Sequence, residues 1–84
     1  MANAYRHQFV ATCPNNGASI IYNLCITVPD ERQIFVEHIV TACALHRSGF
    51  HEAIAADLFA RFGGHQVLRA HHHGVDIETT RGSL

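Results

Sequence analysis

Residues 19–28, which read SIIYNLCITV, alternate between apolar and more polar side chains and decide the fold class of this chain. The even positions from Ile20 to Val28 are all apolar, whereas the odd positions include Asn23, Cys25 and Thr27. A period of two is typical of a strand in an antiparallel sheet that packs one face against a core and leaves the other in water. We therefore predict a half-buried antiparallel strand over this stretch.

The segments on either side predict a second strand and a helix. Residues Tyr5–Thr12 alternate loosely, and the turn CPNNG at 13–17 joins them to residue 19, because proline fixes φ while asparagine and glycine tolerate positive φ. Beyond the strand, Asp30 is the predicted N-cap of a helix, and Gln33 lies in the reciprocal capping position. Apolar residues between 34 and 45 lie nearly all round this helix, which predicts burial on more than one face.

A second helix and a second hairpin complete the chain. An apolar residue recurs at every fourth position from Phe50 to Phe62, and Gly63-Gly64 ends this helix. Residues 65–72 and 75–80 then read as two strands joined by a turn at 73–74. The order ββααββ predicts an α+β fold, in which both helices cover one face of a four-stranded antiparallel sheet.

Length and composition predict a single globular domain over residues 1–84 that associates with copies of itself. Hydrophobic residues make up 48% of the chain and charged residues 15%, a balance that excludes intrinsic disorder. A chain of this length buries only about 60–70% of the surface that its unfolded form exposes. Without disulfides or a metal, a homo-oligomer is therefore the expected source of additional stability.

Charge and cysteine content exclude several functions and predict a cytoplasmic location. All six basic residues are arginines, and the absence of lysine excludes Schiff-base catalysis and a Walker-type phosphate loop. A net charge of −1 argues against a protein that binds the nucleic-acid backbone, because such binding needs many cationic contacts. Three cysteines without scaffold spacing indicate reduced thiols inside a cell. No stretch reads as a signal peptide or a membrane span, so we expect no membrane partner.

Cys13 is the first candidate for chemistry. It precedes a proline in a turn after a short strand, where a thiol can be exposed and its thiolate reached by a substrate. Cys25 and Cys43 are predicted to be buried. The alternative is that all three cysteines are small core residues, which is the commoner role of a free cysteine.

His51 and Glu52 form the second candidate, in the first turn of the second predicted helix. A polar pair at this position can face a ligand. The alternative is structural, because the helix macrodipole favours an acidic residue at an N-terminus without any function. Asp57 and Arg61 are spaced as an i,i+4 ion pair on the exposed side of this helix, and we interpret them as structural support.

Eight histidines in 84 residues raise the question of a metal site. On a strand, His71 and His73 would share one face, and with His65 or Cys13 they could form a tetrahedral zinc site. The spacing matches no standard zinc pattern, so we predict no metal. A titratable, partly exposed strand end or subunit contact is the favoured interpretation.

Three short motifs, placed along the order ββααββ, resemble the QueF-like tunnelling-fold (T-fold) family, which acts on 7-cyano-7-deazaguanine. They are ATCP at 11–14, VPDE at 28–31 before a helix, and FHEA at 50–53 at the start of the next helix. The family includes the NADPH-dependent nitrile reductase of queuosine synthesis and the related archaeosine amidinotransferase. Residues 67–78, VLRAHHHGVDIE, resemble the last hairpin of the family, and IAADL at 54–58 resembles its amidinotransferase branch.

The resemblance implies covalent chemistry at a site between subunits, whose sheets close into a barrel on oligomerisation. Cys13 takes the place of the family nucleophile, which attacks the nitrile carbon and forms a thioimide. A thiolate is a soft nucleophile suited to such a carbon. His51 and Glu52 match the family pair that contacts the substrate. A glutamate can accept two hydrogen bonds from a guanine-like edge, and a histidine can serve the thioimide nitrogen.

Two departures from the family pattern bear on the reaction. Reductase members carry a Glu-Ser-Lys-type stretch that binds NADPH, whereas the corresponding helix here reads FVEHIV, and Glu37 alone matches an acidic family position. The aspartate that transfers protons in the family lies seven residues after the cysteine, where this chain has Ile20 beside Ser19. His7, His51 or Ser19 would have to replace this aspartate in an active enzyme.

These features favour an amidinotransferase-like enzyme that captures 7-cyano-7-deazaguanine as a Cys13 thioimide and uses no cofactor. An NADPH-dependent reductase of the same nitrile is one alternative, and a catalytically silent purine-binding oligomer, in which Glu52 holds the base, is another. A relative of the zinc-dependent pterin-forming tunnelling-fold enzyme is the third. The sequence leaves open whether the final acceptor is a free base, transfer RNA or DNA, which donor supplies nitrogen or hydride, and how many subunits assemble.

Overall fold

In the computed structural model, which describes residues 1–84, the alternating segment forms the long strand β2 (Ser19–Pro29). Its even-numbered side chains are all buried, and Ile26 and Val28 have no solvent exposure. The preceding strand β1 (Ala2–Thr12) pairs with β2 in antiparallel register along its whole length. β1 begins earlier than the predicted Tyr5, because β2 offers it pairing partners as far as its last residue.

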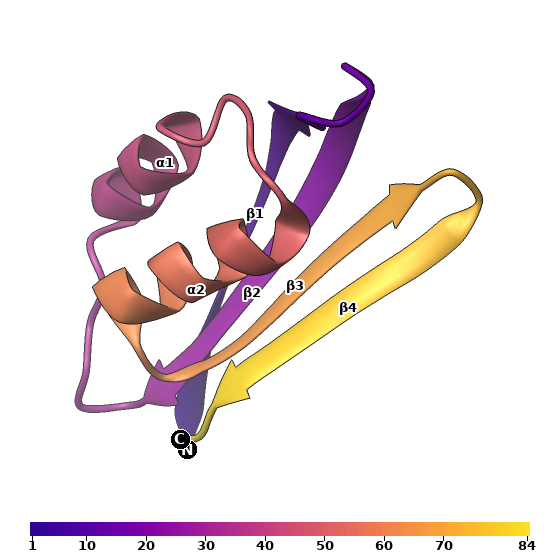
Figure 1. The fold of residues 1–84 in the computed structure, drawn as a ribbon. Coiled ribbons are helices and arrows are strands. Elements are labelled where there is room, and N and C mark those ends of the chain that lie inside the picture. Colours follow the sequence, from indigo (N-terminus) through magenta and orange to yellow (C-terminus); the bar gives the residue numbers. More distant parts are fainter.

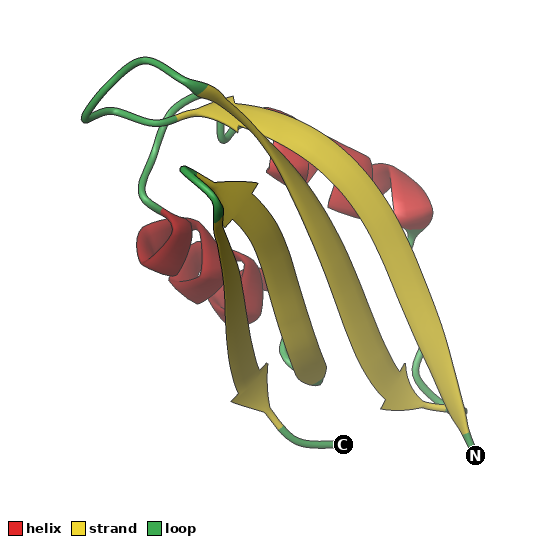
Figure 2. Cartoon of the chain, turned by 90° about the vertical axis from the view of Figure 1, so that its right-hand side faces the viewer, coloured by secondary structure: helices red, strands yellow, loops and turns green.

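The four strands form one antiparallel sheet in the order β1-β2-β3-β4, where β3 is His65–His72 and β4 is Val75–Gly82. The helices α1 (Val36–Ala44) and α2 (His51–Phe62) connect β2 to β3 and lie on the same side of the sheet (Figures 1 and 2). α1 packs on β1, and α2 packs on β3 and β4. The predicted order ββααββ and the position of both helices on one face are confirmed.

A single hydrophobic core of 17 buried residues fills the space between the helices and the sheet. Leu58 of α2 has no solvent exposure and Ile54 has 1%, as the predicted apolar stripe requires. The opposite face of the sheet carries Gln8, Asn23 and Arg69 in neighbouring register positions. This second face, which no helix covers, is called the open face below.

The start of α1 differs from the sequence prediction. The helix begins at Val36, with Phe35 at the N-cap and no side-chain hydrogen bond at the cap. Asp30 and Gln33 therefore do not form a capping box, and that prediction is wrong. The residues between β2 and α1 form a turn and a loop instead.

Contacts with distant elements hold this loop in place. The guanidinium of Arg32 donates a hydrogen bond to the carbonyl of Phe62, at the end of α2. The Ile34 N–H donates to the hydroxyl of Tyr5 on β1 at 3.3 Å. Both contacts form only once the chain has folded, so the local capping signal in the sequence could not reveal them.

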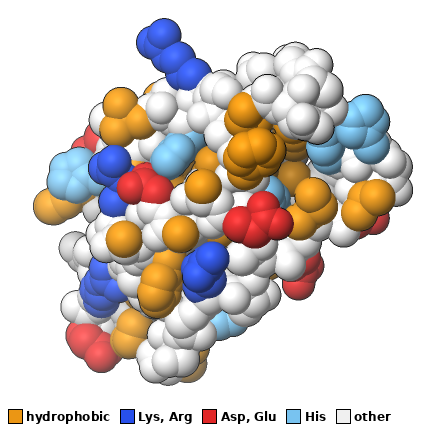
Figure 3. Space-filling model, in the orientation of Figure 1, with side chains coloured by type: hydrophobic (Ala, Val, Ile, Leu, Met, Phe, Trp, Pro, Cys, Tyr) orange, Lys and Arg blue, Asp and Glu red, His pale blue; other side chains and the backbone are white.

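α1 buries one face, through Ile39, Ala42 and Cys43. The prediction of burial on more than one face is wrong within a single chain. Four large apolar side chains of the helix and its ends have exposed fractions of 49% to 67%: Phe35, Val36, Val40 and Leu45. Figure 3 shows hydrophobic side chains at the surface on the helical side of the molecule. None of the helices has the length and the apolar run that crossing a bilayer requires.

The outer side of α2 carries the predicted ion pair. Arg61 Nε donates to Asp57 Oδ2 at 2.8 Å, and His46 Nε2 lies 2.6 Å from the same oxygen. Burial raises the pKa of the Asp57 carboxyl, but the hydrogen bonds from Arg61 and His46 outweigh this effect and lower the pKa below its ordinary value. These contacts tie the helix to the loop after α1 and support its structural interpretation.

A buried glutamine ties the end of α2 to β3. The Gln66 side-chain amide donates to the carbonyl of Leu58 in α2 at 3.1 Å and to that of Gly63, just after the helix, at 2.8 Å. Gly64, with φ of 70°, lies so close to Thr27 that a Cβ atom would stand 2.7 Å from its carbonyl oxygen. Only glycine fits there, so this position in the connection from α2 to β3 requires glycine.

Replacing Gln66 with leucine should lower the free energy of unfolding by about 1–3 kcal/mol, because the carbonyls of Leu58 and Gly63 lose the hydrogen bonds from this buried amide. The matched control is Gln8→Leu, which removes an exposed amide from the open face. It should change the free energy of unfolding by less than about 0.5 kcal/mol. Urea denaturation at a fixed protein concentration measures both values, and equal losses would contradict the assigned role of Gln66.

Candidate functional site

A small cavity opens where the turn between β1 and β2 meets the first turn of α2 and the strands β2 and β3. Its volume is about 90 Å³. The groups at its wall that can take part in chemistry are a thiol, a phenol, two imidazoles and a carboxylate: Cys13, Tyr22, His51, His72 and Glu52. Three residues that the sequence singled out, Cys13, His51 and Glu52, thus meet at one cavity within one chain.

Two backbone hydrogen bonds place α2 beside the cysteine turn. The Thr12 N–H donates to the Arg47 carbonyl at 2.8 Å, and the Gly49 N–H donates to the Thr12 carbonyl at 3.2 Å. Thr12 and Ser48 thereby form a short parallel bridge at the end of β1. Because the cysteine directly follows Thr12 and α2 begins two residues after Gly49, this bridge brings the thiol and the helix start together.

The turn that carries Cys13 is closed by its own backbone. The Cys13 N–H donates to the Ala18 carbonyl at 2.8 Å, and the Gly17 N–H donates to the Cys13 carbonyl at 2.8 Å. Gly17 has φ of 74°, a conformation that glycine adopts without steric cost. Contrary to the sequence prediction, the Cys13 side chain is buried, with 6% exposed. A ligand therefore reaches the thiol through the cavity.

His51 is buried at the start of α2, and neither ring nitrogen has a hydrogen-bond partner in the chain. Burial lowers the pKa of His51 below its ordinary value of 6.5. The Glu52 carboxylate and the nearby Leu68 backbone, which approaches the ring without hydrogen-bond geometry, oppose this effect but do not overcome it. His51 is therefore a neutral imidazole at neutral pH, with a nitrogen lone pair that can accept a proton.

Sequence reasoning counted Tyr22 only among the apolar positions of β2 and missed it as a site residue. Its ring stacks on Phe9 with 5.2 Å between centroids, and its centroid lies 5.5 Å from that of His51. Burial raises the pKa of the Tyr22 hydroxyl, and electrostatic interaction with Cys13 and Glu52 raises it further. The hydroxyl therefore keeps its proton at neutral pH. A polar group in an otherwise aliphatic series was the signal that could have identified it.

His72 is the second cavity residue that sequence analysis did not assign to the site. The Asn16 side-chain nitrogen lies 3.4 Å from Nε2 of His72 and 2.6 Å from Nε2 of His73. Asn16 Oδ1 accepts the Ala18 N–H at 3.0 Å, which leaves the amide nitrogen to donate to the imidazoles. These contacts hold the turn between β3 and β4 against the cysteine turn.

The histidines considered for zinc lie apart. His73 has φ of 51° and lies in the turn after β3, so it does not share a strand face with His71. His71 Nδ1 instead lies 2.7 Å from Asp76 Oδ1. No group of three or more histidine, cysteine, aspartate or glutamate side chains is arranged to hold a metal ion.

Three other predicted site residues lie outside the cavity. Glu37 is exposed in the first turn of α1, and Ser19 is exposed at the start of β2. His7 is half-buried on β1 and stacks on Phe9 with 6.4 Å between centroids, so two core rings separate it from His51. Of the three residues considered as replacements for the family aspartate, His51 alone lines the cavity.

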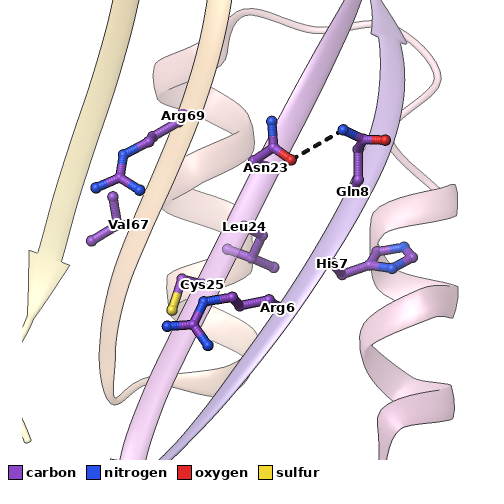
Figure 4. A pocket seen from close by; sticks show the side chains of 8 residues that line it. All are labelled: Arg6, His7, Gln8, Asn23, Leu24, Cys25, Val67 and Arg69. Atoms are coloured by element: carbon purple, nitrogen blue, oxygen red, sulfur yellow. Dashed lines mark hydrogen bonds between the residues drawn. The ribbon is translucent and has the colours of Figure 1, made fainter.

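The other two cysteines have different surroundings. Cys43 is buried as predicted, and burial raises the pKa of its thiol to about 11. Cys25 is half-buried, not buried, because its odd position in β2 places it on the open face. There it lines a cleft of about 240 Å³ together with Arg6 and Arg69 (Figure 4). His7 also lines this cleft, but its ring points away from the thiol toward α1.

The cavity at the start of α2 is suited to the addition of a sulfur nucleophile to an electrophilic carbon. It combines a thiol with a neutral base and a carboxylate, which is the set that nucleophilic catalysis by cysteine requires. Its volume is well below the roughly 300–1,000 Å³ of ordinary small-molecule pockets. The cavity therefore has room for only a small group, and the exposed Glu52 lies at its rim.

Comparison with solved structures finds the same fold in the crystal structure of the archaeosine synthase QueF-Like in the apo form. The two structures superpose with a TM-score of 0.84, over 98% of this chain and 92% of that chain, at 15% sequence identity. No family sequence model and no curated protein matches the chain. At this identity the structural match establishes the fold, and the predicted tunnelling fold is confirmed. Closure into a barrel by oligomerisation stays a prediction.

The buried state of His51 predicts a loss of stability in mild acid. Because the folded-state pKa lies below 6.5, the unfolded chain takes up a proton at His51 first as the pH falls. The free energy of unfolding should be highest above about pH 6.5 and decline below it, until the folded-state pKa is reached, by at most about 1.4 kcal/mol per pH unit from this residue. His51→Gln should remove this part of the slope in urea denaturation between about pH 8 and pH 5.

The matched control for this measurement is His38→Gln, since His38 is exposed on α1 and outside the cavity. This variant should retain the acid slope of the unmodified protein. A slope that persists unchanged in His51→Gln would contradict the assignment.

Proposed function

We propose that this chain is a member of the QueF-like family of 7-deazaguanine metabolism and captures the nitrile of 7-cyano-7-deazaguanine as a covalent thioimide on Cys13. The observation that carries the proposal is that Cys13, His51 and Glu52, which match the nucleophile and the substrate-contacting pair of that family, line one cavity. The fold shared with a QueF-like archaeosine synthase supports it. The ligand is proposed to enter with its nitrile toward the thiol.

The proposed addition needs no redox partner. The sulfur of Cys13 forms a bond to the nitrile carbon, one π bond of the nitrile breaks, and the thiol proton ends on the nitrogen. His51 accepts this proton from the thiol and passes it on, a role that fits a buried imidazole whose lowered pKa keeps it neutral. Amidine formation follows when ammonia or an amine adds to the thioimide carbon and expels the Cys13 thiolate.

Glu52 is the proposed anchor for the purine-like ring. Its carboxylate is exposed at the rim of the cavity, where it can accept hydrogen bonds from the N1–H and the exocyclic amine of a guanine-like edge. The cavity of about 90 Å³ leaves this ring outside the chain, so a second subunit is proposed to cover it. Glu37 would reach the ligand from such a neighbouring chain, since it lies away from the cavity of its own chain.

The surface of the chain supports a homo-oligomer in the cytoplasm. The exposed apolar side chains around α1 and the two unpaired sheet edges, β1 and β4, are features that soluble proteins usually cover by association. Three free cysteines fit a reducing compartment. The acceptor is proposed to be a deazaguanine base, either free or attached to nucleic acid.

Two other functions remain as alternatives. An NADPH-dependent reductase would consume NADPH when mixed with the nitrile, but the chain has no lysine to match the cofactor-binding stretch of the reductases. A silent purine-binding oligomer would bind the nitrile without a covalent bond, and would lose this binding in Glu52→Ala. Calorimetric binding without any change in mass would select this second alternative.

Mixing the protein with 7-cyano-7-deazaguanine should raise its intact mass by that of one ligand per chain, because addition of a thiol to a nitrile loses no atoms. Cys13→Ala should abolish the adduct, and the matched control Cys25→Ala should retain it, since Cys25 lies on the open face. Mass spectrometry with peptide mapping makes the measurement. The absence of an adduct at every pH tested, or an adduct that survives in Cys13→Ala, would overturn the proposed function.

The oligomer should depend on the apolar surface of α1. Val40→Glu places a charge among the exposed apolar side chains and should shift the protein toward monomers in sedimentation velocity. Leu84→Glu, at another exposed apolar residue outside α1, is the matched control and should leave the assembly intact. A wild-type protein that sediments as a monomer at all concentrations would contradict the prediction.

A further inference from the structure

The site lacks a group in the place of the family aspartate. That position is Ile20, and the neighbouring Ser19 points away from the cavity into solvent. As sulfur adds to a nitrile, negative charge develops on the nitrogen, and a donor that faces the nitrogen lowers the barrier. For the proposed reaction, this donor would have to come from another residue of the cavity wall.

Tyr22 has the placement that such a donor requires. Its side chain is 1% exposed and lines the cavity together with the thiol and the buried imidazole. The ring stacks on Phe9, with 5.2 Å between centroids and an interplanar angle of 13°, and its centroid lies 5.5 Å from that of His51, at 39°. A buried ring that packs against two other rings keeps its hydroxyl in one position, which is the preorganisation that electrostatic catalysis needs.

The charge environment keeps this hydroxyl a donor. Burial raises the pKa of the Tyr22 hydroxyl, and electrostatic interaction with Cys13 and Glu52, which line the same cavity, raises it further. A phenol in such surroundings stays protonated at neutral pH and can donate one hydrogen bond. Its neighbours in the sheet face that line the cavity, Ile20 and Ala70, are apolar.

His72 is the other unassigned group at the wall, and it is less suited to the role. Its Nε2 faces the Asn16 amide nitrogen at 3.4 Å, so this contact uses its acceptor nitrogen. It is also half-exposed at the rim, whereas the thiol lies in the buried part of the cavity. Through Asn16, His72 instead helps to hold the turn between β3 and β4 against the cysteine turn.

We infer that Tyr22 is a further catalytic residue of this site, whose hydroxyl donates a hydrogen bond to the nitrile nitrogen while Cys13 adds to the carbon. The inference rests on the proposed function. Tyr22 keeps its proton throughout: the sulfur–carbon bond forms, a π bond of the nitrile breaks, and the thiol proton travels through His51 to the nitrogen. The phenol stabilises the charge that appears on nitrogen before this proton arrives.

The test compares Tyr22→Phe with Tyr5→Phe, the only other tyrosine of the chain. Both changes remove a single hydroxyl and keep the ring, but the Tyr5 hydroxyl accepts the Ile34 N–H far from the cavity. The rate of adduct formation at saturating 7-cyano-7-deazaguanine, followed by mass spectrometry, should fall about 10²-fold in Tyr22→Phe, the loss expected for one such donor. Tyr5→Phe should retain the rate of the unmodified protein.

A second measurement separates catalysis from packing. Fluorotyrosine, introduced into the Tyr5→Phe background so that Tyr22 alone carries it, keeps the hydroxyl but lowers its pKa. If Tyr22 donates its proton in a hydrogen bond, the rate of adduct formation should fall at alkaline pH, where the hydroxyl loses this proton. In the fluorinated protein this fall should occur at a lower pH, which a purely structural role of Tyr22 would not cause. Binding of 7-deazaguanine, which has no nitrile, should be equal in wild type and Tyr22→Phe.

The outcomes distinguish the inference from the function on which it rests. No adduct in the unmodified protein would sink the proposed function itself. An adduct that forms equally fast in wild type and Tyr22→Phe, with an unchanged alkaline limit in the fluorinated protein, would overturn the role of Tyr22 and leave the proposed function standing.

Discussion

The backbone bridge between Thr12 and residues 47–49 is the constraint on which the candidate site depends. It joins the end of β1 to the loop before α2 through two N–H to carbonyl hydrogen bonds. The thiol of Cys13 and the imidazole of His51 are far apart in the sequence, and this bridge brings both to one cavity. The same loop also covers the cysteine turn, because Gly49 and Phe50 form part of the cavity wall, so the thiol is buried although it lies in a surface turn.

Burial then sets the protonation of the groups that the bridge has gathered. It lowers the pKa of His51 and raises the pKa of Tyr22, so both side chains are neutral at neutral pH for the same physical reason. One neutral group can accept a proton and the other can donate a hydrogen bond. Burial has the same effect on Cys43, since it raises the pKa of this thiol to about 11 and keeps it protonated at neutral pH.

The two faces of the sheet have different roles: one is buried within the chain, and the other is uncovered. The face on the helix side carries the core and the candidate site, and the helices of the same chain cover it. The open face, the sheet edges and the outer side of α1 stay uncovered. A cavity that admits only the end of a ligand, beside a surface that favours association, is the arrangement expected if a second copy completes the pocket. A short chain can form a larger site in this way without a larger core.

The sequence by itself determined the order ββααββ, the buried side of β2 and the candidates Cys13, His51 and Glu52, because periodicity and short motifs are properties of neighbouring residues. It could not determine where α1 begins, since the loop before it depends on contacts of Arg32 and Ile34 with distant elements. Tertiary structure alone decided that the three candidates share a cavity and that Tyr22 joins them. The reason is that backbone hydrogen bonds at Thr12 and desolvation by packed neighbours leave no trace in the local pattern of residues.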